Sequence, residues 1–171
     1  MHYIYCPKCG NKLQPRQAGD DGAVPYCESC SRYWFDSFSN LVMVLVYNEQ
    51  DEIVLTRQGY LSQQYANLTS GYIQPGESAE EAAAREVREE LGFAVQKLTF
   101  AGTCWFEQSD MLITGFAAYV PKQDFCLSEE VDSAQWVPYE EAPALMFPDQ
   151  PGNSIWVVYR HYLKMREQGL L

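Results

Sequence analysis

The chain has 171 residues, of which 47% are hydrophobic and 14% aromatic, and its formal net charge is −11. This length suits one domain with a small appendage, and the apolar content excludes a disordered or fibrous protein. Non-specific binding to nucleic acid is disfavoured, because an acidic surface repels phosphate backbones. We find no apolar run of about 18 residues that would span a bilayer and no signal-peptide pattern. We therefore expect a cytoplasmic protein without a membrane partner.

Residues 1–36 form the first expected domain, which has too few aliphatic residues to fold without a cross-link. It contains two Cys-x-x-Cys pairs separated by 17 residues, which are Cys6, Cys9, Cys27 and Cys30. Four cysteines in this spacing predict a closed, structural Zn²⁺ site, with disulfides or another metal as the alternatives. The basic residues of this segment are offset by acidic ones. A scaffolding or lid role is therefore favoured over nucleic-acid or protein binding.

Residues 37–171 form the second expected domain, which opens with a continuous apolar run at 41–47. Such a run is typical of a strand that is covered on both faces. A turn at 48–51 leads into a strand at 52–57, which predicts a hairpin. Further strands are expected within 65–73 and at 98–107, 111–120 and 134–138, with a final helix at 154–167.

A helix over residues 78–91 is the clearest element. Ser78 and Glu81 form a capping-box pattern, and Gly92 stands where a left-handed residue ends a helix. At about 100° per residue, three glutamates fall in one sector, and a small apolar set in the next sector would dock on a sheet. The glutamates are Glu86, Glu89 and Glu90, and the apolar set is Ala83, Ala84, Val87 and Leu91.

Three neighbouring carboxylates repel one another unless a cation or protons neutralise them, and hard oxygen ligands favour Mg²⁺ or Mn²⁺. The alternative is a solvated acidic helix face. A plain surface helix, however, does not require Gly71, Glu77, Arg85 or the Pro75–Gly76 turn.

These residues together resemble the signature of the Nudix hydrolase family, G-x5-E-x7-R-E-U-x-E-E-x-G-U, where U is a bulky apolar residue. All nine fixed positions match, namely Gly71, Glu77, Arg85, Glu86, Val87, Glu89, Glu90, Gly92 and Phe93. The resemblance implies an α+β fold, in which an α/β/α sandwich with a mixed sheet follows the zinc ribbon. It also implies hydrolysis of a nucleoside diphosphate linked to another moiety.

The resemblance further assigns roles to individual residues. The Gly71 carbonyl and the carboxylates of Glu86, Glu89 and Glu90 would bind the catalytic metal, while Arg85 and Glu77 would brace the loop before the helix. Glu130 resembles a downstream acidic position that adds a metal ligand, with an ordinary surface glutamate as the alternative. The general base stays open between Glu86, Glu89 and a loop carboxylate.

A zinc ribbon before a Nudix domain is similar to the NADH pyrophosphatase (NAD diphosphatase) branch, which splits NAD(H) into nicotinamide mononucleotide and AMP. Arg32-Tyr33 and the segment 151–155 resemble that branch, and Tyr72 resembles an aromatic residue that stacks on nicotinamide. The resemblance also implies a small-molecule nucleotide substrate and a homodimer.

The chain departs from the branch after the signature. Trp105, Phe106, Ser109 and Met111 echo the branch's substrate-binding motif, but its prolines are absent. Two roles remain as alternatives for Trp105 and Phe106, which are stacking on a base of the substrate and packing in the core. ADP-ribose, another nucleotide sugar or an NAD-capped RNA end are therefore alternative substrates. A different class of function is a binding module on a non-catalytic scaffold.

Overall fold

The computed structural model describes residues 2–171. The chain divides into two compact units, Met1–Phe38 and Ser39–Leu171. The division lies close to the expected boundary between residues 36 and 37. Within the described residues no helix has the length and apolar character needed to cross a bilayer.

The first unit is a small antiparallel sheet of three strands in the order β1-β2-β3. The strands are β1 (Gln14–Gln17), β2 (Ala23–Cys27) and β3 (Arg32–Tyr33), and a short 3-10 turn, η1 (Gly19–Asp21), joins the first two. Its buried hydrophobic cluster consists, among the described residues, of Cys6, Leu13 and Cys27. A core of this size cannot hold the unit together alone, which agrees with the expected cross-link.

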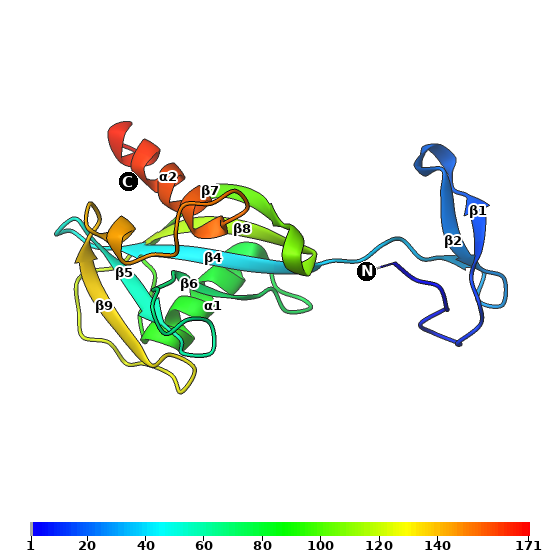
Figure 1. The fold of residues 1–171 in the computed structure, drawn as a ribbon, viewed down its shortest axis with the longest axis horizontal. Helices are drawn as coiled ribbons and strands as arrows, with labels where there is room; N and C mark the ends of the chain where they lie inside the picture. The colour runs from blue at the N-terminus through cyan, green and yellow to red at the C-terminus, as the bar shows by residue number, and fades with distance from the viewer. Residues whose placement is uncertain (1) are drawn as a thin grey trace. The chain divides into compact units, whose positions relative to one another are not determined.

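The second unit is built on a six-stranded mixed sheet in the order β7-β8-β4-β5-β9, with β6 also paired to β4 (Figure 1). β4 and β8 run parallel, and the other pairings are antiparallel. The strands are β4 (Ser39–Tyr47), β5 (Glu52–Arg57), β6 (Thr69–Tyr72), β7 (Lys97–Phe106), β8 (Met111–Tyr119) and β9 (Ser133–Pro138). Two 3-10 turns, η2 (Glu107–Ser109) and η3 (Ala142–Ala144), follow β7 and β9.

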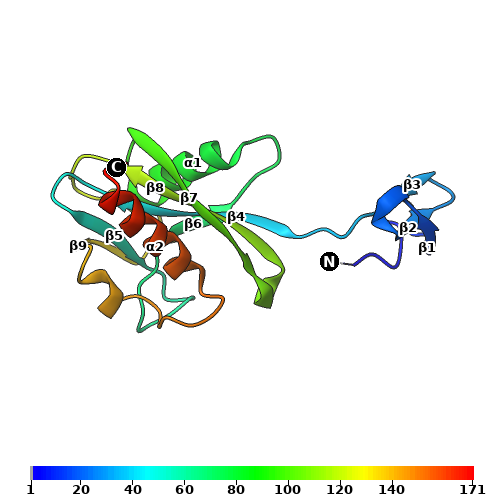
Figure 2. The same cartoon turned by 90° about the horizontal axis from the view of Figure 1, so that it is seen from above.

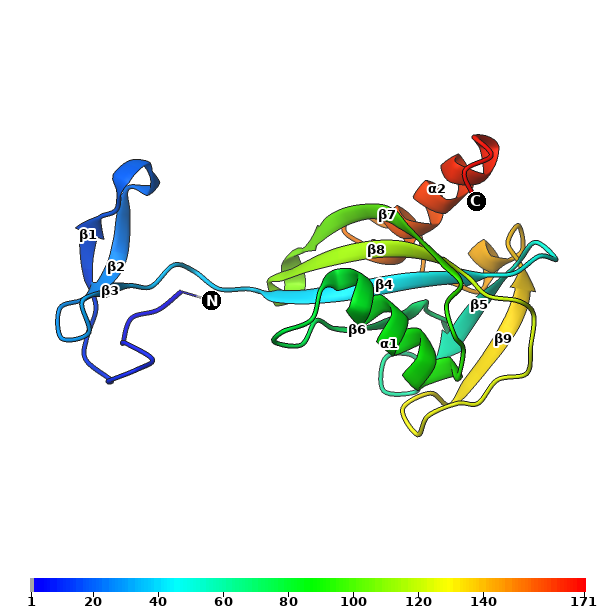
Figure 3. The same cartoon turned by 180° about the vertical axis from the view of Figure 1, so that it is seen from behind.

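Two helices cover opposite faces of this sheet (Figure 2 and Figure 3). Alternate residues of β4 explain why: Val42, Val44 and Val46 pack with the buried side of α1 (Ala79–Leu91). Met43 and Leu45 point the other way and pack with α2 (Ser154–Glu167). The predicted strand with two covered faces and the predicted α/β/α sandwich are thus confirmed.

The predicted boundaries hold except in the third strand, where β6 begins only at Thr69. The residues before it make isolated bridges instead, Ala66 with Met146 and Asn67 with Thr56. This stretch is buried between two different partners, and a period-two pattern does not reveal that arrangement.

Helix α1 has both predicted caps. Ser78 Oγ accepts from the Glu81 backbone N–H at 3.2 Å, and Glu81 Oε2 accepts from the Ser78 N–H at 2.7 Å. Gly92 ends the helix at φ +79°. Its buried residues are Ala82, Ala83, Val87, Glu90 and Leu91. Ala82 therefore takes the place expected for Ala84, and one glutamate lies on the buried side.

Candidate active site

Arg85 organises the loop that precedes α1. Its Nε and Nη2 donate to the two carboxylate oxygens of Glu77 at 3.0 and 2.7 Å, and Nη2 also donates to the Tyr72 carbonyl at 2.9 Å. Glu77 Oε1 accepts the backbone N–H of Gln74 at 2.6 Å. The Arg85 guanidinium lowers the pKa of Glu77, so the pair stays charged and ties the loop to the helix.

The same guanidinium also holds two of the predicted metal ligands. Arg85 Nη1 donates to Glu86 Oε1 at 2.6 Å and to Glu89 Oε2 at 3.1 Å. The Glu86 side chain is 12% exposed and that of Glu89 is 52% exposed. Burial raises the pKa of Glu86 although Arg85 lowers it. Glu86 is therefore an interior carboxylate, whereas Glu89 lies at the rim.

Gly71 is required by the close approach of Glu86. A Cβ atom at position 71 would lie 1.9 Å from Glu86 Oε1, far inside any allowed contact. Gly71 pairs with Val42, so its position on the sheet faces α1. Position 71 must therefore be a glycine because a side chain there would collide with Glu86, whose carboxylate lies against the backbone of β6.

Glu90 is the most unusual group of the site, because it is a glutamate with only 3% of its surface exposed. Gln58 Nε2 donates to Glu90 Oε1 at 3.1 Å. Within residues 2–171, neither Glu90 Oε2 nor the neighbouring Thr69 Oγ1 has a hydrogen-bond partner. Burial, and then the negative charge of Glu86, raise the pKa of Glu90 to about 7.

The burial of Glu90 speaks against the solvated-face interpretation of this helix. A buried carboxylate with one oxygen unpartnered is costly unless a proton or a cation satisfies that oxygen. The free Glu90 oxygen and the contact of Glu86 with Gly71 both fit a divalent cation with oxygen ligands.

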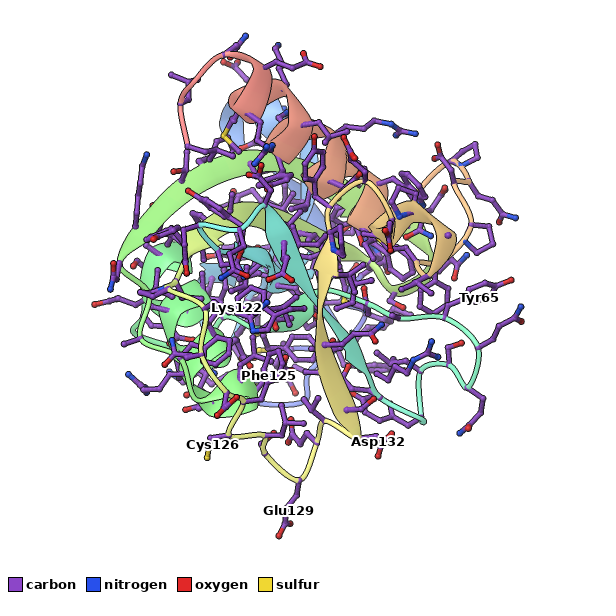
Figure 4. The ribbon with its side chains drawn as sticks, turned by 90° about the vertical axis from the view of Figure 1, so that its left-hand side faces the viewer. Tyr65, Lys122, Phe125, Cys126, Glu129 and Asp132 are labelled. Atoms are coloured by element: carbon purple, nitrogen blue, oxygen red, sulfur yellow. The ribbon has the colours of Figure 1, made fainter. Side chains whose placement is uncertain are left out.

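Glu130 lies at the same site, on the loop between β8 and β9. Its charge adds to the rise in the pKa of both Glu86 and Glu90. The loop is held to the end of α1 by hydrogen bonds from the Cys126 and Ser128 N–H groups to the carbonyls of Leu91 and Glu90, at 3.0 and 3.4 Å. In Figure 4 the adjacent Glu129 points away from the domain, which makes it a natural control for Glu130.

Aromatic stacking fixes the base of this loop. The ring of Phe125 lies 5.2 Å from that of Phe93 and 5.7 Å from that of Trp136, both stacked. Phe93 is the last residue of the signature, so its bulk anchors the loop that carries Glu130.

The three helix glutamates do not form one compact ligand cluster. Among residues 2–171, the four cysteines are the one set of three or more candidate ligands whose donor atoms all lie within 4.8 Å of one another. Glu89 is drawn to Arg85 instead of toward Glu90. A bound cation would therefore have to draw Glu89 away from Arg85.

The cysteine set in the first unit has the geometry of a tetrahedral metal site. Cys6 and Cys30 have their sulfurs 3.9 Å apart, and the sulfurs of Cys9 and Cys27 are 3.6 Å apart. Ligands at about 2.3 Å from a tetrahedral zinc would be separated by about 3.8 Å. These separations are too long for disulfides, and all four cysteines are free.

The backbone of the first cysteine pair fits the same site. The Gly10 N–H donates to the Cys6 carbonyl at 2.8 Å, with Gly10 at φ +76°. Desolvation raises the pKa of Cys6, but hydrogen bonds with the backbone of Cys9 and Lys8 and with the thiols of Cys9 and Cys27 outweigh it and bring the pKa to about 6. The neighbouring thiols, Cys9 first, and desolvation raise the pKa of Cys30 to about 12, so the four sulfurs share their protons until a cation replaces them.

A cavity of about 410 Å³ lies on the α2 side of the sheet. Its wall includes Met43, Leu61, Phe106 and Phe147, with Asn67 and Ser154 as polar members. Tyr72 pairs with Leu41, whose side chain packs on the same α2 side. The structure thus places two predicted substrate contacts, Tyr72 and Phe106, on one face of the sheet.

The other two predicted contacts lie elsewhere. Trp105 precedes Phe106 in β7 and pairs with Leu112, so it faces the α1 side of the sheet. Ser109 is an exposed residue of η2 and is not part of the cavity wall. Trp156, whose indole N–H donates to the Phe147 carbonyl at 2.7 Å, holds a segment of that wall in place.

The sequence analysis did not identify Gln58, Tyr60 or Thr69 as residues of this site. Gln58 touches Glu90 across 32 residues of chain, and Thr69 reaches it from β6. For Gln58, the one signal in the sequence is that a polar residue directly follows a buried strand.

A family model for the NUDIX domain matches residues 39–157. The chain is 31% identical over 145 residues to a protein named NAD-capped RNA hydrolase NudC from Pseudomonas aeruginosa, a match that covers 84% of this chain and 51% of that relative. A relative of the same name from Stutzerimonas stutzeri is 31% identical over 142 residues, with 82% and 50% covered. The chain thus spans about half the length of the curated relatives it matches.

Solved structures share the fold. A NUDIX hydrolase from Nitrosomonas europaea has a TM-score of 0.74 at 19% identity, covering 98% of this chain and 94% of that one. The NUDIX domain of Shewanella oneidensis NrtR, solved as a complex with ADP ribose, has a TM-score of 0.64 at 14% identity, covering 82% and 94%. At these identities the likeness concerns the fold alone.

Proposed function

Because this chain belongs to the NUDIX family, we propose that it hydrolyses the diphosphate bond of a nucleoside diphosphate derivative with the help of Mg²⁺ or Mn²⁺. The observation that carries the proposal is the buried Glu90 carboxylate, because its Oε2 atom has no hydrogen-bond partner among the described residues and a divalent cation would satisfy it. The preferred substrate is NAD(H), which would give nicotinamide mononucleotide and AMP. Relatives named NAD-capped RNA hydrolase support this choice.

The cation would be held by Glu86, Glu89, Glu90 and the Gly71 carbonyl, with Glu130 as a further ligand from the loop. Once bound, it would neutralise the diphosphate and make an attacking water more acidic. The water's proton would pass to a nearby carboxylate, and Glu86, Glu89 and Glu130 are the candidates within the proposed set. Arg85 and Glu77 position the loop and the helix and do not take up that proton.

The cavity on the α2 side would receive the base or the nicotinamide ring. Phe106, in the cavity wall, would supply flat aromatic surface for stacking, and Asn67 and Ser154 would supply polar groups. Tyr72 lies on the same face of the sheet but outside the wall, so it would extend this aromatic surface. Trp105 and Ser109 do not line the cavity, so any contact from them would be with parts of the substrate that extend beyond it.

The four cysteines would bind a structural Zn²⁺, since all four ligand positions are supplied by the protein. We keep a homodimer and an NAD-capped RNA end as proposals for the intact protein. ADP-ribose and other nucleotide sugars are the competing small-molecule substrates.

A substrate panel tests the function. The full chain is incubated with NADH, ADP-ribose, a dinucleoside polyphosphate and an NAD-capped RNA, with Mg²⁺ or Mn²⁺, and the products are identified by mass spectrometry. Release of AMP and reduced nicotinamide mononucleotide from NADH is expected, and Glu89→Gln should remove most of the activity. Glu80→Gln, an exposed change on the same helix, is the matched control.

The outcomes separate the hypotheses. If the protein cleaves ADP-ribose in preference to NADH, then ADP-ribose replaces NAD(H) as the proposed substrate. If every substrate stays intact with both metals, the chain is not a hydrolase of this class and a binding module becomes the better description.

A further inference from the structure

The loop between β5 and β6 connects the carboxylates to the cavity. At its start, Gln58 donates to Glu90 at 3.1 Å. At the next residue, Gly59 donates its N–H to Asp132 Oδ2 at 2.5 Å. Farther along, Leu61 lines the cavity. Residue 60 therefore lies in the chain between a residue that contacts the proposed metal ligand Glu90 and a residue that lines the proposed base pocket.

The loop is held in place by many hydrogen bonds. The N–H groups of Leu61 and Ser62 donate to the Gln58 carbonyl at 2.8 and 3.2 Å. Ser62 Oγ accepts from the N–H groups of Gln64 and Tyr65 at 3.1 and 2.9 Å. Such a tightly bonded loop can present one side chain in a defined place.

That side chain is Tyr60, which is 75% exposed, the largest exposed fraction among the large hydrophobic residues of residues 2–171. Its hydroxyl makes no hydrogen bond in the part of the chain that the structure describes. Partial desolvation, and then the charges of Glu90 and Glu130, raise the pKa of Tyr60. The ring thus lies within electrostatic reach of both carboxylates, and its phenol keeps the proton that it could donate.

We infer that Tyr60 is a substrate-binding residue of this site, whose phenol O–H donates to an oxygen of the substrate diphosphate between the carboxylates and the cavity. The inference rests on the proposed function. The charge of the site supports it: Glu86, Glu90 and Glu130 repel a diphosphate, so a neutral donor at the mouth helps to hold it. Folding does not require the exposed ring.

The test compares Tyr60→Phe, which removes only the hydroxyl, with wild type. KM for NADH and for ADP-ribose is expected to rise about tenfold, as for a lost hydrogen bond to a charged group, with kcat and the melting temperature nearly unchanged. Tyr5→Phe, at a tyrosine that is 60% exposed in the first unit, is the matched control and should leave both constants at the wild-type values.

Three results overturn the inference. Unchanged KM in Tyr60→Phe and in Tyr60→Ala would show a surface tyrosine without a role. A rise confined to NADH would place the contact on the nicotinamide riboside part, since the two substrates share the ADP part. A lowered melting temperature with a proportional loss of folded enzyme would show a structural role instead.

Binding measurements keep this inference separate from the proposed function. Calorimetric titration of ADP-ribose in Ca²⁺ should give a dissociation constant about tenfold weaker for Tyr60→Phe than for wild type. If wild type binds ADP-ribose in this Tyr60-dependent way but cleaves nothing, the inference stands and the hydrolase proposal falls. If wild type cleaves and Tyr60→Phe binds equally well, only the inference falls.

Discussion

Replacing Glu90 by glutamine should make the metal-free protein more stable while it abolishes the proposed activity. The amide keeps an oxygen that can accept from Gln58 and has nearly the same volume, so the change removes mainly a buried charge. Because Glu90 is only 3% exposed, solvent screens that charge little.

The magnitude follows from the pKa of Glu90, which rises from 4.5 to about 7 on folding. The folded state holds the proton more tightly than the unfolded chain, so stability falls as the pH rises between these two values. At about 1.4 kcal/mol per pKa unit, the shift amounts to roughly 3 kcal/mol. Wild type should lose this stability between pH 4.5 and about 7, and Glu90→Gln should not.

Urea unfolding followed by tryptophan fluorescence measures the difference. A Trp34→Phe background removes the tryptophan of the first unit, so the remaining three report on residues 39–171. The buffer is freed of Mg²⁺ and Mn²⁺ by dialysis without chelator, so that zinc is retained. Adding Mg²⁺ above pH 7 should stabilise wild type and leave Glu90→Gln unchanged.

A stability difference between wild type and Glu90→Gln that stays constant from pH 4.5 to 8 would refute this reasoning. Glu80→Gln should run parallel to wild type throughout, since Glu80 is exposed at the other end of α1.

Three further predictions concern the surrounding residues. Gly71→Ala should lower kcat at least about a hundredfold, because its Cβ would lie 1.9 Å from Glu86 Oε1 and displace a proposed ligand. Ser70→Ala is the control, and near-wild-type turnover in Gly71→Ala would contradict the geometry. Glu130→Gln should raise the Mg²⁺ concentration for half-maximal activity about tenfold, while Glu129→Gln should not, and equal behaviour of the two would remove Glu130 from the site. Cys9→Ser should release zinc, which mass spectrometry measures, and should expose residues 1–38 to protease while residues 39–171 stay resistant. The control variant Cys126→Ser should keep zinc in the four-cysteine site. Unchanged protease resistance in Cys9→Ser would argue against a structural site.

Local signals account for the elements that the sequence predicted well. The capping box at Ser78 and the left-handed Gly92 bound α1 through contacts within a few residues, so they can be recognised without the fold. The run at 41–47 predicted a strand covered twice, because its alternate side chains enter the two cores that face α1 and α2. The signature predicted which residues meet at the loop and helix, including the Arg85–Glu77 pair.

Contacts between distant segments could not be predicted from the sequence. Gln58 contacts Glu90 from the loop that follows β5, Thr69 belongs to β6, and Tyr60 lies in the loop between them. No periodicity links those positions to α1. The sequence placed Trp105 and Phe106 together as stacking residues, but adjacent residues of a strand face opposite sides of a sheet. Only the register of β7 with β8 shows which of the two reaches the cavity side.

The sequence alone indicated the chemistry of this protein: four cysteines at the spacing of a metal site, three glutamates in one sector of a helix, and the glycine of the signature. The tertiary structure alone decided the state of those groups, burying Glu90, pairing Glu86 and Glu89 with Arg85, and bringing Glu130 to the same site. The physical reason is that residue type and local spacing fix what a side chain can bind. Its desolvation and its charged neighbours depend on segments that meet only when the sheet forms.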